Sequence, residues 1–130
     1  MIIKLLLKHK IKLALAAVCY TAVLTYFCLV TPDKFSNIIS QSDKVIHALA
    51  YFLFTISWFV AGFNLFKTES LKLYVYNFLW ALSYGVLIEI LQHYCTISRQ
   101  GDFKDICANI LGTVIALVVM RLFFNKFVKS

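Results

Sequence analysis

The stretch that decides the fold is RQGDFKDICANILG, residues Arg99–Gly112, in which a polar segment turns into an apolar one. Four of its residues lie at offsets 0, 3, 7 and 10 and share an arc of roughly 80° on an α-helix. They are Asp102, Asp105, Asn109 and Gly112. The stretch therefore predicts a helix whose one face carries two carboxylates and an amide, beside a glycine that lets another helix come close.

The composition around this stretch is that of a membrane protein. Apolar residues make up 62% of the chain and charged residues 15%, whereas soluble domains have about 45–50% and about 25%. The surplus falls into four apolar runs, each long enough to cross the hydrocarbon core of a bilayer. These runs are Leu13–Val30, Val45–Phe66, Leu73–Leu91 and Ile106–Phe124. They predict one all-α domain over residues 1–130, an integral membrane bundle of four antiparallel transmembrane helices.

The net charge of +7 is distributed as a topology signal, so no nucleic-acid partner is expected. With four spans, nine bases lie on one side of the membrane, at Lys4, Lys8, Lys10, Lys12, Lys67, Lys72, Arg121, Lys126 and Lys129. The other side has four, at Lys34, Lys44, Arg99 and Lys104. By the positive-inside rule, both termini are predicted to be cytoplasmic. The first apolar run is longer than the core of a usual signal peptide, which predicts a retained helix.

Three of the predicted spans carry polar residues near their outer ends. The second span begins with Asp43, His47 and Tyr51 at helical spacing i, i+4, i+8. Glu89 lies inside the third run, followed by Gln92. An ionisable group inside lipid is costly, so Glu89 should face the bundle interior or a watery cavity. Because His47, Glu89, Asp105 and Asn109 would lie at one depth, we expect a shared polar site near the extracytoplasmic surface.

The residue types alone are compatible with several functions for such a site. Histidine with aspartate and glutamate suits zinc or manganese, but neither H-E-x-x-H nor C-x-x-C is present, so no metal and no cofactor is predicted. General acid–base work by Glu89 or Asp105 with His47 is chemically reasonable, and these three are the catalytic candidates. A further reading is a structural network of hydrogen bonds that fixes the register of the helices.

The bases near this site provide a way to hold an anion. Lys44 and Arg99 could bind an anionic head group, the arginine through its planar fork of donors. The polar connection between the second and third spans and several aromatic residues are predicted to lie on the protein surface. The connection Lys67–Ser70 reads as a solvated turn, and the aromatic residues Trp58, Phe59, Tyr74 and Tyr76 read as facing lipid or the interface.

At these residues the chain resembles the VanZ-like family of small bacterial membrane proteins. The likeness comprises D-K-V-x-H-x-x-x-Y at Asp43–Tyr51, E-x-x-Q at Glu89–Gln92 and R-Q-G-D-x-x-D-x-x-x-N-x-x-G at Arg99–Gly112. It covers the second to fourth predicted helices, in order. The family often has a proline just before the arginine, where this chain has Ser98.

The resemblance implies a multi-pass protein of the bacterial cytoplasmic membrane with a role in the cell envelope. Its partners would be membrane lipids and a lipid or cell-wall head group bound in an outer polar pocket. The residues implied for that pocket are Asp43, Lys44, His47, Tyr51, Glu89, Gln92, Arg99, Asp102, Asp105 and Asn109. The family's named member is associated with teicoplanin resistance, so glycopeptide resistance is one role suggested. Two alternatives stay open: an intramembrane hydrolase or transferase acting on a lipid-linked substrate, and a structural membrane subunit.

Overall fold

The computed structural model describes residues 9–30, 43–96 and 102–127. These residues form four α-helices, and none of them lies in a strand. The helices are α2 (Lys10–Val30), α4 (Asp43–Phe66), α5 (Leu71–Cys95) and α6 (Phe103–Phe127). Each is long and apolar enough to cross a membrane. The prediction of an all-α chain with four candidate membrane-spanning helices is therefore confirmed.

Most helix ends lie outside the apolar runs from which they were predicted, although α2 ends at Val30 and α4 at Phe66, as the runs do. Helix α5 continues to Cys95, four residues beyond Leu91, and α6 begins at Phe103, three residues before Ile106. The difference arises because backbone hydrogen bonding continues through polar residues, whereas a run of hydropathy stops at them. Local capping supports two of the ends: the Ser70 hydroxyl accepts from the Leu73 N–H, and Asp102 Oδ1 accepts from the Lys104 N–H.

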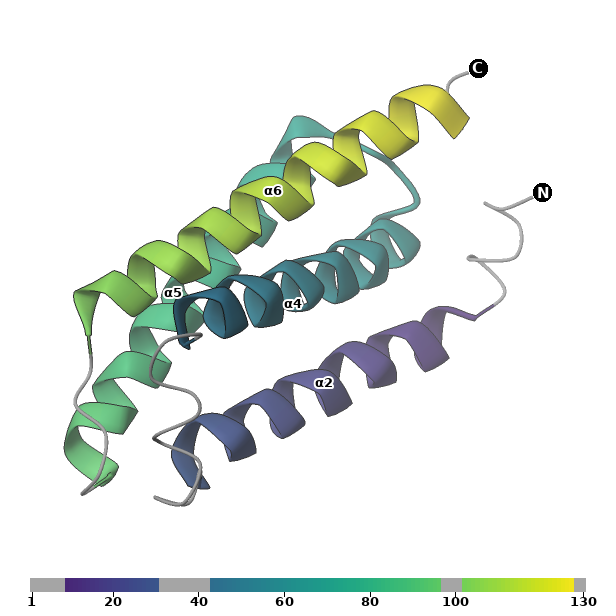
Figure 1. Cartoon of the computed structure of the whole chain (residues 1–130). Helices are drawn as coiled ribbons and strands as arrows, with labels where there is room; N and C mark the ends of the chain where they lie inside the picture. The colour runs from purple at the N-terminus through teal and green to yellow at the C-terminus, as the bar shows by residue number, and fades with distance from the viewer. Residues whose placement is uncertain (1–8, 31–42, 97–101, 128–130) are drawn as a thin grey trace.

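Successive helices run in opposite directions, and α4 lies at the centre of the arrangement (Figure 1). Helix α4 packs most extensively against α6 and also contacts α2 and α5. Since the helices are antiparallel, the start of α4, the end of α5 and the start of α6 meet at one end of the bundle. This is the end at which the sequence predicts a polar site.

Two clusters of buried side chains fill the interior. One joins α2, α4 and α5, and the other joins α4, α5 and α6. The first comprises Cys28, Tyr51, Phe54, Ala81, Tyr84 and Ile88, and the second comprises Phe59, Phe63, Leu73, Met120 and Phe124. Phe59 is fully buried, so its prediction as a lipid-facing residue is wrong: its face of α4 packs on α6, a neighbour that hydropathy alone does not identify.

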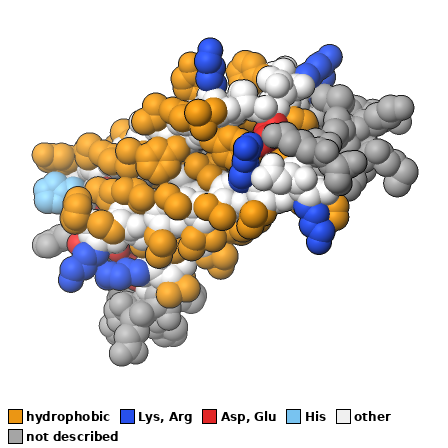
Figure 2. Space-filling model, turned by 90° about the horizontal axis from the view of Figure 1, so that it is seen from above, with side chains coloured by type: hydrophobic (Ala, Val, Ile, Leu, Met, Phe, Trp, Pro, Cys, Tyr) orange, Lys and Arg blue, Asp and Glu red, His pale blue; other side chains and the backbone are white. Residues whose placement is uncertain are grey.

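The outside of the bundle is largely apolar, as lipid contact requires. Figure 2 shows hydrophobic side chains over most of the visible face. Exposed large apolar residues occur on all four helices, for example Phe27, Val45, Tyr76 and Leu122. Tyr76 therefore does lie on the surface, as predicted. The bundle hides polar groups and shows apolar ones, the opposite of a water-soluble fold.

Polar side chains attach α2 to the rest of the bundle. The Tyr20 hydroxyl donates to the Ala50 carbonyl at 2.9 Å, and the Trp58 indole donates to the Thr21 hydroxyl at 3.0 Å. The Tyr84 and Thr25 hydroxyls are also hydrogen-bonded. Trp58 was predicted to face lipid, but its ring nitrogen points to α2, because an indole N–H inside a membrane needs an acceptor.

Candidate polar site where α4, α5 and α6 meet

His47 lies at the centre of a buried polar cluster. It is 6% exposed and stands one turn into α4. Its Nε2 is 3.6 Å from Asp43 Oδ1, one turn earlier on the same helix, and 3.7 Å from Asp105 Oδ2 on α6. The two carboxylates therefore flank one ring nitrogen from two helices.

The other ring nitrogen of His47 meets an amide. Its Nδ1 lies 3.2 Å from Asn109 Oδ1, and Asn109 is 3% exposed. Asn109 follows Asp105 by one helical turn, so one face of α6 meets both sides of the imidazole ring. The predicted face of Asp105, Asn109 and Gly112 is thus turned into the bundle, where all three residues are buried.

Glu89 joins the cluster from α5. It is 5% exposed and faces the interior, as the cost of a carboxyl group in lipid predicts. Its Oε2 accepts from the backbone N–H of Asp102 at 3.1 Å. It lies within electrostatic range of His47 and Asp105. Glu89 therefore binds the first turn of α6, where unpaired N–H groups attract an anion.

The other predicted ligands take different positions around this cluster. Asp102 is half-buried and caps α6, and Lys44 is exposed beside Asp43. Tyr51 packs against Phe54 and Tyr84. Gln92 is buried, but its amide donates to the Cys28 carbonyl of α2 at 2.9 Å. Gln92 thus binds α5 to α2. Arg99 lies outside the described residues.

Several buried polar atoms of the cluster have no hydrogen-bond partner among the described residues. They are Glu89 Oε1, Asp105 Oδ1, Asn109 Nδ2 and Tyr51 Oη. An unsatisfied buried polar group costs about 1–3 kcal/mol. A network that served only to hold the helices would be expected to close on itself. Glu89, Asp105 and Asn109 instead each leave one polar atom available for a further group.

The geometry also bears on metal binding. Asp43, His47 and Asp105 each offer one ligand atom, and these three atoms all lie within 4.8 Å of one another. The ligands come from residues i and i+4 of α4 and from the first turn of α6. No short sequence motif spans them, which explains why a search for H-E-x-x-H or C-x-x-C does not find the group.

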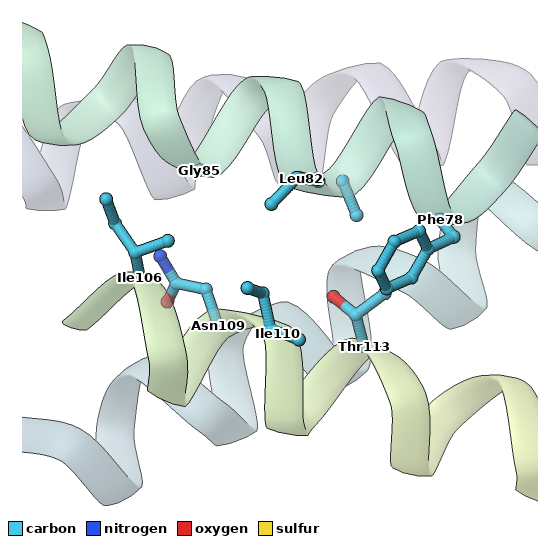
Figure 3. A pocket seen from close by; sticks show the side chains of 8 residues that line it. Phe78, Leu82, Gly85, Ile106, Asn109, Ile110 and Thr113 are labelled. Carbon is cyan, nitrogen blue, oxygen red and sulfur yellow. The ribbon is translucent and has the colours of Figure 1, made fainter. Parts of the chain in front are cut away.

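In the described part of the chain, two hollows adjoin the bundle surface that His47, Glu89 and Asp105 do not line. One is a narrow crevice between α5 and α6 with no room for a water molecule, lined by Asn109, Thr113, Gly85 and apolar residues. Figure 3 shows the amide of Asn109 directed toward α5 beside Gly85. The other has a volume of about 170 Å³ and lies at the opposite end of the bundle from the polar cluster, beside Lys72 and Tyr76.

A second polar cluster, at the opposite end, corrects a prediction. Glu69 was assigned to a solvated turn, yet its side chain is only 5% exposed. Its Oε1 accepts from the Tyr74 hydroxyl at 2.7 Å and from Arg121 Nη1 at 2.6 Å. The turn thus binds α6, and Tyr74 faces this pair and not lipid. The available signal was a pair of opposite charges near the ends of neighbouring spans.

Sequence reasoning also missed polar contacts deep in the apolar spans. The Thr55 hydroxyl donates to Thr113 at 3.3 Å, and the Asn77 amide donates to the Thr55 carbonyl at 3.3 Å. All three residues are buried. A polar residue inside an apolar run was the signal here, because such a side chain seeks a partner on another helix.

The comparisons with known proteins return no relative. No family model matches the chain, and no curated protein and no solved structure is similar to it. Function therefore has to be argued from the geometry of the polar cluster and from the motifs of the sequence.

Proposed function

We propose that this chain is a VanZ-like protein of the bacterial cytoplasmic membrane that binds a lipid or cell-wall head group through its polar cluster. The observation that supports this most is the set of buried, unpaired polar atoms on Glu89, Asp105 and Asn109. Such atoms at the end of an apolar bundle are suited to a polar group that enters from the membrane surface.

The proposed topology places both termini in the cytoplasm and the cluster on the extracytoplasmic side. Lys67, Lys72 and Arg121 lie at the opposite end of the helices from His47. Their number relative to the bases near the cluster supports this orientation by the positive-inside rule. The head group would then be one that the outer leaflet presents.

The bases beside the cluster are proposed to meet the anionic part of the head group. Lys44 is exposed and adjacent to Asp43, and Arg99 precedes α6 by a few residues in the sequence. Arginine binds phosphate or carboxylate through two parallel hydrogen bonds. His47, Glu89, Asp105 and Asn109 would shape the site and meet the uncharged polar groups.

Native mass spectrometry of the purified full chain tests this proposal. Phosphatidylglycerol and a polyprenyl phosphate are added separately, and the bound fraction is compared among variants. Lys44→Ala and Arg99→Ala are expected to reduce the bound fraction severalfold. The matched control is Lys72→Ala, which removes an exposed lysine at the other end of the bundle and is expected to bind like the wild type.

The same measurement separates head-group binding from a purely structural role. Glu89→Gln and Asp105→Asn keep the shape of each side chain and remove its charge. If both variants fold normally, by thermal unfolding and size-exclusion chromatography, but bind less lipid, the cluster is a site. If both lose folded protein while lipid binding of the surviving fraction is unchanged, the cluster only holds the helices together and the proposal is wrong.

A further inference from the structure

We propose that Asp43, His47 and Asp105 form a binding site for a divalent metal ion of the zinc class. The inference deepens the proposed function and rests on it in one respect only: the metal would supply the positive charge that draws a phosphate-bearing head group to an acidic cluster. Binding of the metal itself is a separate property and can be measured without lipid.

The first argument is the spacing of the three ligand atoms. His47 Nε2 lies 3.6 Å and 3.7 Å from the two carboxylate oxygens, which is longer than a normal hydrogen bond. Bonds of about 2.0–2.2 Å to a tetrahedral zinc ion set neighbouring ligand atoms roughly 3.3–3.5 Å apart. The two distances from His47 Nε2 to the carboxylate oxygens are therefore within a few tenths of an ångström of that value. The two carboxylate oxygens lie within 4.8 Å of each other, and a bound ion would draw them closer together.

The second argument is the orientation of the imidazole ring. Asn109 Oδ1 can only accept, so its contact with His47 Nδ1 places a hydrogen on that nitrogen. A ring that carries no second proton presents the lone pair of Nε2 to Asp43 and Asp105, whose oxygens are also acceptors. Three acceptors facing one another need a cation between them. A carbonyl that accepts from the non-ligating nitrogen is also the usual support for a metal-bound histidine.

The third argument is the burial of Asp105 and its unpaired second oxygen. Asp105 is 7% exposed, and its Oδ1 has no hydrogen-bond partner among the described residues. A lone carboxylate in such a place carries a large desolvation penalty. A metal ion would offset that penalty and use the free coordination capacity of the carboxylate. Three protein ligands would also leave one tetrahedral position open for an oxygen of a phosphate group.

The ligand types narrow the choice of ion. An imidazole nitrogen favours zinc and its neighbours in the first transition row, whereas magnesium and calcium prefer oxygen alone. Affinities for sites of this kind rise from manganese to copper and fall again at zinc, which still binds more tightly than manganese. We therefore expect zinc to bind more tightly than manganese, and magnesium not to compete at equal concentration.

The experiment is metal titration of the full chain, purified in detergent with an affinity tag that contains no histidine. The protein is treated with chelator, supplied with zinc chloride, desalted and analysed for zinc by mass spectrometry. Wild type is expected to retain one zinc per chain and to gain thermal stability. His47→Gln and Asp43→Asn are expected to lose both effects. The Asp43 side chain is 29% exposed, so Asp43→Asn should fold even if a change at buried Asp105 does not.

Two further variants make the test specific. His93→Gln removes an exposed histidine at the end of α5 that carries the polar cluster. This variant should retain one zinc per chain. Asn109→Ala should lower zinc affinity about 10–100-fold, since it removes the group that orients His47 and leaves the three ligands in place. Zinc affinity is the readout for Asn109→Ala, because a loss of helix packing alone would lower stability in the presence and absence of zinc equally.

Three outcomes would overturn the inference. One is folded wild-type protein that retains no zinc. Another is unchanged zinc content in His47→Gln, and the third is equal retention of zinc and magnesium. Zinc binding without any effect of zinc on lipid binding would leave the metal site standing and remove its link to the head group. Lipid binding that persists in chelated protein would likewise count against that link alone.

Discussion

Gly112 of α6 lies against the backbone of Ala48 of α4, the residue that follows His47. A Cβ atom added at Gly112 would stand 2.8 Å from the Ala48 carbonyl carbon and 3.0 Å from its Cα, with the carbonyl oxygen closer still. Real Cβ atoms do not approach backbone atoms this closely. The missing side chain therefore lets α4 and α6 touch, and this contact brings Asn109, three residues earlier, within reach of His47.

The substitution Gly112→Ala is expected to destabilise the protein. The new methyl group has to push α6 away from a rigid backbone, which costs about 1–3 kcal/mol. This cost opposes the gain of up to about 1 kcal/mol that alanine brings over glycine inside a helix. Thermal unfolding in detergent measures the net effect, and a lower midpoint is expected. Zinc or head-group binding should fall as well, because His47 and Asn109 would separate.

The matched control is Gly62→Ala on α4. There the nearest atom to an added Cβ is the end of the Leu73 side chain, at 2.9 Å, and a leucine methyl can move where a backbone cannot. We expect Gly62→Ala to be near neutral. If Gly112→Ala and Gly62→Ala unfolded at the same temperature, close backbone contact between α4 and α6 would not be what sets their spacing.

Substitution of Glu69 should weaken the opposite end of the bundle. Glu69→Ala removes the acceptor of both Tyr74 and Arg121, and the expected loss of stability is about 1–3 kcal/mol, since the glutamate side chain is almost fully buried. Arg121→Ala should have a smaller effect, because more than half of the Arg121 side chain is exposed. Thermal unfolding of the two variants gives the comparison. Unfolding of Glu69→Ala at the wild-type temperature would contradict a stabilising role for these contacts.

A double-mutant cycle can measure how much one hydrogen bond contributes to the packing of α2 against α4. Trp58→Phe removes the indole donor, and Thr21→Val removes the hydroxyl that accepts from it. Hydrogen bonds between membrane helices contribute about 0.6 kcal/mol on average, and a coupling energy of that size is expected between the two substitutions. Reversible unfolding of the wild type, both single variants and the double variant provides it. A coupling energy of zero would show that the two side chains do not interact in the folded protein.

Labelling of single cysteines tests the proposed topology. Cys95 is exposed at the end of α5 that carries the polar cluster, and Thr68 is exposed at the other end of the bundle. With the remaining cysteines replaced by alanine, a membrane-impermeant maleimide should label Cys95 in intact cells. The Thr68→Cys variant without Cys95 should be labelled only after the cells are permeabilised. The reverse pattern would place the cluster on the cytoplasmic side.

Much of the site could be predicted from polar residues inside apolar runs. Glu89 had to face the interior because lipid cannot solvate a carboxylate, and helical spacing alone placed Asp105, Asn109 and Gly112 on one face. That Gly112 permits close approach was also predictable from its lack of a side chain. Head-group binding by these residues, and the likeness to VanZ-like proteins, stay predictions.

Partners could not be predicted, because each polar side chain had several candidates at the same depth. Gln92 was grouped with Glu89, yet its amide binds α2, since the rotation of α5 turns the two residues to different neighbours. Glu69 was predicted to lie in a solvated turn, but its carboxylate accepts hydrogen bonds from Tyr74 and Arg121. Hydropathy reports the cost of exposing a group and carries no information about which helix satisfies it.

The sequence by itself determined that this chain forms four apolar helices with a polar set at one end, because burying carboxylates and backbone groups in lipid leaves few alternatives. Only the tertiary structure decided that Asp43, His47 and Asp105 converge on one point while Asn109 orients the ring. The distance and rotation between α4 and α6 set that convergence. They depend on the contact of Gly112 with Ala48, which couples residues more than sixty positions apart in the chain.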